Sequence, residues 1–304
     1  SYLLDRKQSM NGCAKKRFEN YKQQPLEFVF DKSFTGKLSQ FGLDPNRRTP
    51  SGIKAAIIRE KGTNGEREMA YMLYLAGFDV KDVTMTDLIS GRETLEDINM
   101  VVYCGGFSNS DVLGSAKGWA GSFLFNPKAK AALDNFYARE DTLSLGVCNG
   151  CQLMMELGLI TPEDKKKGKM LHNDSHKFES NFLGVTVPMN RSVMFGSLSG
   201  SKLGIWVAHG EGKFSLPYPE DHYNVVLKYS YDEYPGNPNG SDYSVAGIAS
   251  QDGRHLAMMP HLERACFPWE NAYYPLDRKE EDQITPWMEA FVNARKWVEA
   301  NRKK

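Results

Sequence analysis

The chain has 304 residues with 38 basic and 38 acidic side chains, so its formal net charge is zero. A general nucleic-acid binder or membrane-surface binder would carry a basic excess, and the balanced charge argues against both. The sequence shows no apolar run near the roughly 18 residues that span a bilayer, and we expect no signal peptide. Its five cysteines do not form a disulfide framework, so we expect a reduced, cytoplasmic protein with neither nucleic acid nor membrane as a partner.

The first 50 residues differ from the rest of the chain. Residues 13–24 have the pattern of a basic amphipathic helix, and residues 43–52 are rich in turn-forming residues, which is typical of a linker. A solvated helix face is the simpler interpretation of the basic side chains. The sequence begins with Ser rather than Met, which we interpret as a sign that it is a piece of a longer protein.

Strands and helices alternate regularly from residue 53 onward. The run at 53–60 is almost continuously apolar, as expected for a parallel strand that is buried on both faces. Thr63 and Glu66 are spaced as a capping box for the helix that follows. The remaining elements expected in this half are a helix at 66–77, strands at 78–85, 98–106 and 142–147, and helices at 127–139 and 151–160.

The second half of the chain shifts toward strands. Asp252–Gly253 has the composition of a tight hairpin turn within one of them. The expected elements are strands at 183–189, 203–212, 223–231 and 245–260, and a closing amphipathic helix at 282–304. The sequence therefore predicts an α/β fold, an open and mostly parallel sheet covered by helices on both faces, with additional strands in the second half.

The stretch GVCNGCQLM carries the strongest chemical signal. Gly146 and Gly150 bracket Cys148 with one residue on each side, at the junction between a strand and a helix. This is the pattern of a nucleophile elbow, with a thiol in place of the usual hydroxyl. The amides and dipole of the helix's first turn favour the reactive thiolate. The backbone N–H of Asn149 is then a candidate donor to a developing oxyanion.

Other interpretations of this stretch remain open. Cys148 and Cys151 form a C-x-x-C pair, so a dithiol oxidoreductase is one alternative, although such motifs lack the bracketing glycines. A metal site needs more ligands than this pair supplies, and we expect none. Cys151 by itself is best explained as a small buried core residue.

A nucleophilic thiol needs a base, and six histidines are available. Two of them have a glutamate two residues later, where an extended backbone brings both side chains to one face: His209 with Glu211, and His261 with Glu263. The second pair is favoured because it follows a strand end, but the first stays open. The others have weaker contexts, although a metal pair is conceivable for the first two: His172, His176, His222 and His255.

The loop after the strand at 98–106 supplies the remaining part of a site. Gly105 and Gly106 directly follow the strand, so bare amides can point into the site, and Gly106 is a second candidate oxyanion donor. The loop matches neither of the glycine-rich phosphate-binding patterns, so it is weak evidence for a nucleotide site.

Five stretches together resemble the glutaminase domain of phosphoribosylformylglycinamidine synthases, which are class I (triad) glutamine amidotransferases with a flavodoxin-like fold. These stretches are REKGTNGERE, CGGFSNSDVLGSAKGWA, GVCNGCQLM, WVAHGEG and AMMPHLER. The resemblance implies a triad of Cys148 as nucleophile, His261 as base and Glu263 as its orienting acid. One departure is Leu262, where many relatives have proline. Substrate contacts are expected at Gly105, Phe107, Ser108, Gln152 and His209.

The same resemblance implies a function and a domain division. The expected reaction is hydrolysis of L-glutamine, with the ammonia supplied to ATP-dependent synthesis of formylglycinamidine ribonucleotide in purine biosynthesis. Residues 1–50 would then be the end of a synthetase region and its linker, and residues 51–304 the glutaminase domain. ATP and Mg would serve only the synthetase domains, which are the expected partners, and the glutaminase domain would need no cofactor. A non-catalytic interaction domain of the same fold is a second alternative.

Overall fold

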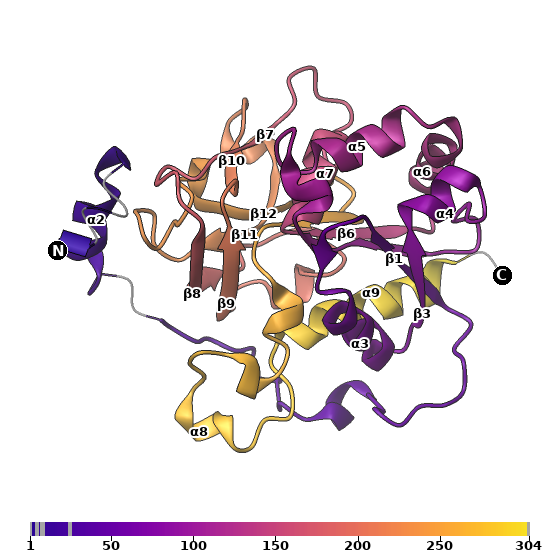
Figure 1. Ribbon diagram of the computed structural model, residues 1–304. Coiled ribbons are helices and arrows are strands. Elements are labelled where there is room, and N and C mark those ends of the chain that lie inside the picture. The colour runs from indigo at the N-terminus through magenta and orange to yellow at the C-terminus, as the bar shows by residue number, and fades with distance from the viewer. Residues whose placement is uncertain (1, 4–5, 7–9, 24–25, 303–304) are drawn as a thin grey trace.

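The computed structural model of the protein describes residues 2–3, 6, 10–23 and 26–302. Figure 1 shows a layered body in which helices cover both faces of a central sheet. In the described residues, nine strands form that sheet in the order β3-β1-β4-β6-β13-β12-β11-β8-β9. No helix in these ranges combines the length and apolar character that crossing a membrane requires.

One half of the sheet is parallel, and all of its strands except the one at the edge are largely buried. It consists of β3 (Asp79–Thr84), β1 (Lys54–Arg59), β4 (Met100–Tyr103), β6 (Leu143–Val147) and β13 (His255–Met258). The other half is joined by antiparallel pairs and consists of β12 (Val245–Ala249), β11 (Asn224–Tyr229), β8 (Glu179–Thr186) and β9 (Lys202–His209). Only β12 and β8 reverse the common direction of the described strands, so the mostly parallel sheet is confirmed.

Helices bury their apolar faces against both sides of this sheet. Figure 1 shows α3 (Glu66–Ala76) and α9 (Trp287–Asn301) on one side. The opposite side carries α4 (Met85–Ser90), α5 (Lys117–Leu124), α6 (Pro127–Ala138) and α7 (Asn149–Glu156). The core between these layers is dominated by large buried side chains, among them Trp119, Phe123, Phe136, Trp287 and Phe291. The predicted fold class is therefore confirmed.

Shorter elements complete the described chain. They are α2 (Cys13–Asn20), α8 (Leu276–Lys279), the pair β2 (Thr63–Asn64) with β5 (Gly105–Gly106), and the pair β7 (Lys169–Leu171) with β10 (Lys213–Ser215). Single 3-10 turns lie at Met10–Gly12, Leu38–Phe41, Ser108–Asp111, Gly196–Leu198, Glu220–His222, Asp242–Ser244, Leu262–Arg264 and Pro268–Glu270.

Two local expectations from the sequence were wrong. The capping box at Thr63 and Glu66 does not form, because Thr63 pairs in β2 and the cap position of α3 is Gly65, whose φ is 85°. A capping box forms instead at α4, where the carboxylate of Asp87 accepts hydrogen bonds from the backbone N–H and the hydroxyl of Thr84. Helix α5 begins at the end of the glycine-rich loop and continues over residues for which the sequence predicted no element.

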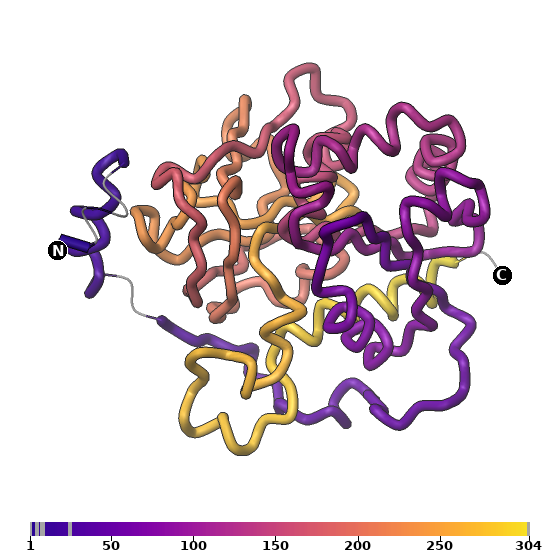
Figure 2. The backbone as a smooth tube through the Cα atoms, viewed as in Figure 1, coloured from indigo at the N-terminus to yellow at the C-terminus, as the bar shows by residue number. Residues whose placement is uncertain are grey.

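The segment before β1 packs along the edge of the protein. Figure 2 shows residues 26–53 running along the lower edge, past the loop that carries α8, and up to β1. Val29 forms an antiparallel bridge to Lys202 at the start of β9. The backbone N–H of Leu38 donates to Gln283 (3.0 Å), and the side chains of Phe34 and Leu43 are buried. The N-terminal segment is thus packed on the sheet and on the α8 loop.

Candidate active site

The turn between β6 and α7 holds Cys148 at the carboxyl end of the central parallel strand. The backbone of Cys148 has φ 55° and ψ −109°, a conformation that non-glycine residues rarely adopt. A methyl group at Gly146 would lie 2.5 Å from the carbonyl oxygen of Gly150, and one at Gly150 would collide with the carbonyl of Tyr103. The glycines therefore let the helix approach the sheet closely enough to form the elbow.

His261 and Glu263 lie just beyond the end of β13, the strand adjacent to β6. The ring Nδ1 of His261 is 2.6 Å from a carboxylate oxygen of Glu263, and both side chains are buried. A Cβ atom at Gly105 would lie 2.9 Å from Cε1 of His261 and 3.2 Å from Cβ of Cys148. The imidazole and the cysteine therefore meet around the bare α-carbon of Gly105.

The protonation state of His261 follows from these neighbours. Burial opposes a charge on the ring, but the negative charge of Glu263 and hydrogen bonds with Cys148 and Glu263 outweigh it and raise the pKa of His261 to about 10. The ring is therefore held as an imidazolium at neutral pH. A positive charge beside a thiol favours the nucleophilic thiolate.

The other candidate pair does not form. His209 is buried, and in the described residues neither of its ring nitrogens has a hydrogen-bond partner. Burial and the neighbouring charge of His261 lower the pKa of His209 to about 3, so the ring is neutral. The carboxylate of Glu211 points elsewhere, toward the backbone N–H of Ser115 (3.4 Å) and the ring of His172 (4.0 Å). Of the two glutamates, only Glu263 contacts its histidine.

The side chain of Asn149 joins the elbow to the loop that follows β4. Its Oδ1 accepts a hydrogen bond from the backbone N–H of Ser108 (3.0 Å). Its Nδ2 donates to Asp111 (3.2 Å) and to the side-chain oxygen of Gln152 (2.9 Å). Gln152 in turn donates to the carbonyl oxygen of Glu211 (2.7 Å). These bonds fix the loop after β4 and the loop after β9 against the first turn of α7.

The loop after β4 presents its residues in different ways. Gly106 has φ 110° and pairs with Thr63, so a side chain there would be strained and would collide with the facing strand. Phe107 is about half exposed, with its ring 6.0 Å from that of Phe178. Ser108 is buried, and its hydroxyl has no hydrogen-bond partner in the described part of the chain.

The remaining histidines lie in structural settings. His222 contacts Asp164 (2.8 Å), and Nδ1 of His255 contacts the hydroxyl of Ser144 (3.0 Å). The rings of His172 and His176 are stacked with centroids 6.1 Å apart. Within the described ranges, no cluster of three or more His, Cys, Asp or Glu side chains is placed to hold a metal ion.

The second cysteine of the C-x-x-C pair is sealed in the core. Cys151 has no exposed surface and forms no disulfide. Burial is the main cause that raises the pKa of Cys151 well above its ordinary value, and the neighbouring Cys148 adds to it. A thiol that resists ionisation and faces the core is a poor resolving group for dithiol exchange.

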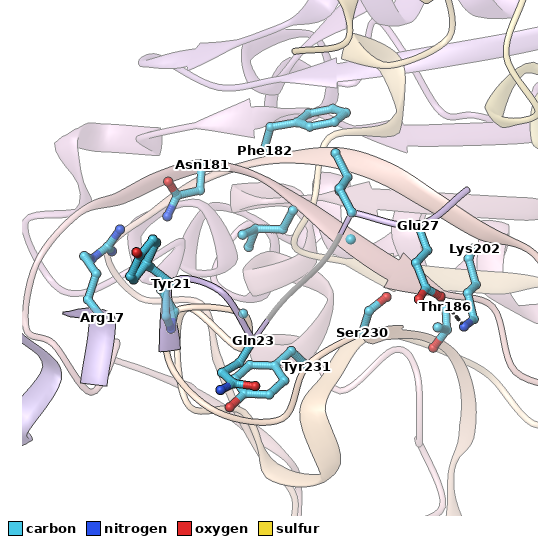
Figure 3. Close-up of a pocket in the computed structure, with 15 residues that line it drawn as sticks. Arg17, Tyr21, Gln23, Glu27, Asn181, Phe182, Thr186, Lys202, Ser230 and Tyr231 are labelled. Carbon is cyan, nitrogen blue, oxygen red and sulfur yellow. Dashed lines mark hydrogen bonds and ion pairs between the residues drawn. The ribbon is translucent and has the colours of Figure 1, made fainter. Parts of the chain in front are cut away.

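A surface cavity of about 410 Å³ lies away from the predicted site residues. Figure 3 shows Arg17 and Tyr21 of the N-terminal segment on one side of it and Asn181 and Phe182 of β8 on another. None of its lining residues belongs to the predicted catalytic set. It marks instead the seam between the N-terminal segment and the antiparallel half of the sheet.

Sequence reasoning missed several groups that surround Cys148. The carbonyl oxygen of Ala208 lies 3.6 Å from its sulfur, and Asp111 and the carbonyl of Glu211 hold Asn149 and Gln152. Backbone carbonyls carry no signal in a sequence. Asp111 does lie within the DVLG stretch that carried the resemblance, so an acidic residue close after the Gly105–Gly106 loop was the one available signal.

Comparison with known proteins identifies the family to which this chain belongs. Residues 52–298 match the CobB/CobQ-like glutamine amidotransferase domain family, so the chain belongs to that family. It is 37% identical to the Drosophila melanogaster phosphoribosylformylglycinamidine synthase over 99% of this chain and 23% of the relative. It is 44% identical to the human protein of that name over 83% of this chain and 21% of the relative. The resemblance predicted from the sequence is therefore confirmed.

A solved structure and a further relative agree with these matches. The structure of PurLQS from Thermotoga maritima superposes with a TM-score of 0.60 at 27% identity, covering 81% of this chain and 99% of that one. An Arabidopsis thaliana relative, 40% identical over 99% of this chain and 22% of its own length, is named as chloroplastic/mitochondrial. The chain thus spans about a fifth of the length of the curated relatives that it matches.

Proposed function

We propose that the chain hydrolyses L-glutamine to glutamate and ammonia with Cys148, His261 and Glu263 as its catalytic triad. The observation that carries this proposal is the buried contact of 2.6 Å between His261 and Glu263 beside a cysteine on a strained elbow. Membership of a glutamine amidotransferase family supports glutamine as the substrate. No cofactor enters the reaction.

The proposed reaction proceeds in two halves. The thiolate of Cys148 attacks the side-chain amide carbon, and the backbone amides of Gly106 and Asn149 stabilise the oxyanion. His261 donates a proton to the departing ammonia, which leaves a glutamyl thioester on the sulfur. The neutral imidazole then takes a proton from water, the water attacks the thioester, and glutamate leaves with the thiol restored. Gly105, Phe107, Ser108, Gln152 and His209 are the proposed substrate contacts.

Labelling with a glutamine-analogue diazo-ketone tests this assignment directly. Mass spectrometry should find a single adduct, on Cys148, and Cys148→Ala should abolish both the adduct and glutamate release. If no adduct forms in the chain alone or with the remainder of the parent protein added in trans, the domain is a non-catalytic interaction module instead.

The dithiol alternative has its own control. Cys151→Ser should retain glutamine hydrolysis, because the burial of Cys151 keeps it out of the reaction. Loss of activity as complete as that of Cys148→Ser would favour a redox pair and overturn the triad.

For the longer protein, we propose that the ammonia feeds ATP-dependent synthesis of formylglycinamidine ribonucleotide in purine biosynthesis. ATP and Mg would be bound by synthetase domains outside these residues. Residues 1–50 would be the end of that region and its linker, and residues 51–304 the glutaminase domain, in line with a family match that begins at residue 52. In the parent enzyme, Cys148→Ala should block synthesis from glutamine and spare synthesis from added ammonia.

A cytoplasmic location remains part of the proposal. The five cysteines are free thiols, and a reducing compartment favours that state. Fractionation of cells followed by immunodetection of the protein would test it, and recovery of the protein only in an organelle would contradict it.

A further inference from the structure

The helix α2 lies outside the residues matched by the family and docks on the protein through specific polar contacts. Arg17 reaches the carboxylate of Glu179 (2.8 Å), and Asn20 donates to the carbonyl oxygen of Tyr234 (2.8 Å). Just before the helix, Asn11 donates to the carbonyl oxygen of Asp174 (2.6 Å). The side chain of Cys13 is buried beneath the helix. Figure 3 shows Arg17 at the edge of the cavity between this segment and β8.

The carboxylate of Glu179 is the centre of this contact. Only 2% of its side chain is exposed, and it also accepts hydrogen bonds from the hydroxyls of Tyr234 (2.9 Å) and Ser175 (2.6 Å). The guanidinium of Arg17 lies over the ring of Tyr234, 4.9 Å from its centroid. A buried carboxylate is costly without a paired charge and hydrogen bonds, so removing Arg17 forces this region to rearrange.

Glu179 stands directly opposite the loop that approaches the catalytic cysteine. In the β8–β9 ladder, Glu179 pairs with His209. Six residues before Glu179, the buried side chain of Asn173 contacts the same loop. It donates to the carbonyl oxygen of His209 (2.7 Å) and accepts from the N–H of Gly212 (3.0 Å). The segment 173–179 therefore contacts the segment 209–212 at two places, through the pairing of Glu179 with His209 and through the side chain of Asn173.

Residues 208–212, which we call the loop after β9, in turn contact the elbow. The carbonyl oxygen of Glu211 accepts the hydrogen bond from Gln152 (2.7 Å), and that of Ala208 lies 3.6 Å from the sulfur of Cys148. Contacts thus lead from Arg17 to Glu179, from Glu179 to its strand partner His209, and from the loop after β9 to the nucleophile, while Asn173 holds the same loop independently.

We infer that Arg17 is a positioning residue for glutamine hydrolysis: it sets the loop 208–212 against the elbow through Glu179 and its strand partner His209. This inference rests on the proposed glutaminase function. It gives the N-terminal segment a role in the reaction, because docking of α2 would determine how well the glutamine pocket is formed. Substitutions along such a contact chain typically alter coupling by roughly 2- to 30-fold.

The test compares Arg17→Met with Lys15→Met in the full chain. Lys15 lies on the same helix with 78% of its side chain exposed and pairs with Glu19 (3.7 Å), so it is the matched control. Arg17→Met should raise KM for glutamine and slow diazo-ketone labelling of Cys148 by roughly 2- to 30-fold. Labelling by iodoacetamide, which needs no glutamine pocket, should change less. Arg17→Lys should restore part of the loss, and Lys15→Met should behave as wild type.

Hydrogen exchange separates this inference from the proposed function. Peptides covering residues 170–180 and 205–213 should exchange faster in Arg17→Met than in Lys15→Met, and by more than the fall in the global unfolding free energy accounts for. Faster exchange in a chain that hydrolyses no glutamine would refute the proposed function and leave the contact chain standing. Unchanged exchange, KM and labelling in Arg17→Met would overturn the positioning role while the proposed function stands.

Discussion

His209 and His261 show how one carboxylate decides the chemistry of a buried ring. Both have a glutamate two residues later, but only Glu263 reaches its histidine. Burial disfavours a charge on both rings. The charge of Glu263 reverses this for His261 and raises its pKa, whereas burial, reinforced by the neighbouring His261, lowers that of His209. The candidate active site therefore combines one imidazole whose pKa is raised with one whose pKa is lowered.

Replacing Glu263 with glutamine should change how stability depends on pH. The raised pKa of His261 means that its protonated form stabilises the fold fully below the unfolded value of 6.5, and that this contribution fades as the pH rises toward about 10. The stability gap between wild type and Glu263→Gln should therefore shrink as the pH rises through this window, by up to roughly 1.4 kcal/mol per pH unit.

Urea unfolding at about pH 6 and about pH 9 measures this gap. Glu211→Gln is the control, because its carboxylate makes no contact with His209 and its gap should depend little on pH. A gap for Glu263→Gln that stays constant or widens at high pH would contradict the assignment.

Asn149 offers a second test at the residue scale. Asn149→Leu keeps the branching of the side chain and the backbone N–H but removes the acceptor for the N–H of Ser108 and the donor to Asp111. Leaving a buried N–H unpaired costs roughly 1–3 kcal/mol, so we expect a loss of that size together with slower glutamine turnover. Asn135→Leu, at an exposed position of α6, should stay within about 0.5 kcal/mol. Equal effects of the two variants in thermal unfolding would refute the role of the Asn149 side chain.

At the scale of elements, the apolar pattern of the sequence predicted the strands more completely than the helices. The inner parallel strands were recognisable because burial on both faces gives them nearly continuous apolar runs, whereas the edge strand β3 exposes Lys81 and Asp82. Helix α5 was missed because Gly118 and Gly121 give it low intrinsic propensity, and it forms because Trp119 and Phe123 are buried against its neighbours. The cap of α3 was misassigned because Thr63 was taken up by pairing with Gly106.

The close approach of α7 to β4 at Gly150 can be tested by substitution. In Gly150→Ala, the new methyl group would meet the backbone carbonyl of Tyr103, which cannot move without disturbing β4. Overpacking of this kind costs roughly 1–3 kcal/mol and should displace Cys148, so activity should fall with stability.

Gly196→Ala is the matched control for this change. A methyl group there would come no closer than 3.9 Å to the carbonyl oxygen of Asn190, and φ at Gly196 is not positive. Thermal unfolding and glutamate release should leave Gly196→Ala close to wild type. A Gly150→Ala protein with full activity would show that the close approach of helix and strand is dispensable.

For the whole molecule, the last helix returns to cover the sheet. Helix α9 packs beside α3 on one face, and the indole N–H of Trp287 donates to the carbonyl oxygen of Gly204 in β9 (2.9 Å). Together with the hydrogen bonds from Asn293 to the carbonyl oxygen of Met194 (3.0 Å) and to the hydroxyl of Ser197 (2.7 Å), this contact joins α9 to the antiparallel side of the sheet. The parallel and antiparallel halves are thereby held by one shared core.

Trp287→Ala should consequently destabilise the entire fold. Loss of a fully buried tryptophan typically costs about 3–5 kcal/mol, and it leaves the carbonyl of Gly204 without its donor. Trp269→Ala removes the same side chain from a position that is 77% exposed and should cost less than about 0.5 kcal/mol. Chemical unfolding of the two variants compares them, and similar midpoints would contradict a single shared core.

The sequence alone determined the features that depend on neighbours along the chain. The bracketing glycines define the elbow at Cys148 because local backbone geometry fixes it, and the spacing of two residues marks His209–Glu211 and His261–Glu263 as candidate pairs. Spacing could not choose between the two histidine–glutamate pairs. That choice depends on β13 lying beside β6, with Met258 opposite Val147, and only the packed sheet establishes this order. The contacts of Asn149, and the reach of Arg17 to the loop after β9, likewise join residues far apart in sequence, so only the tertiary structure decided them.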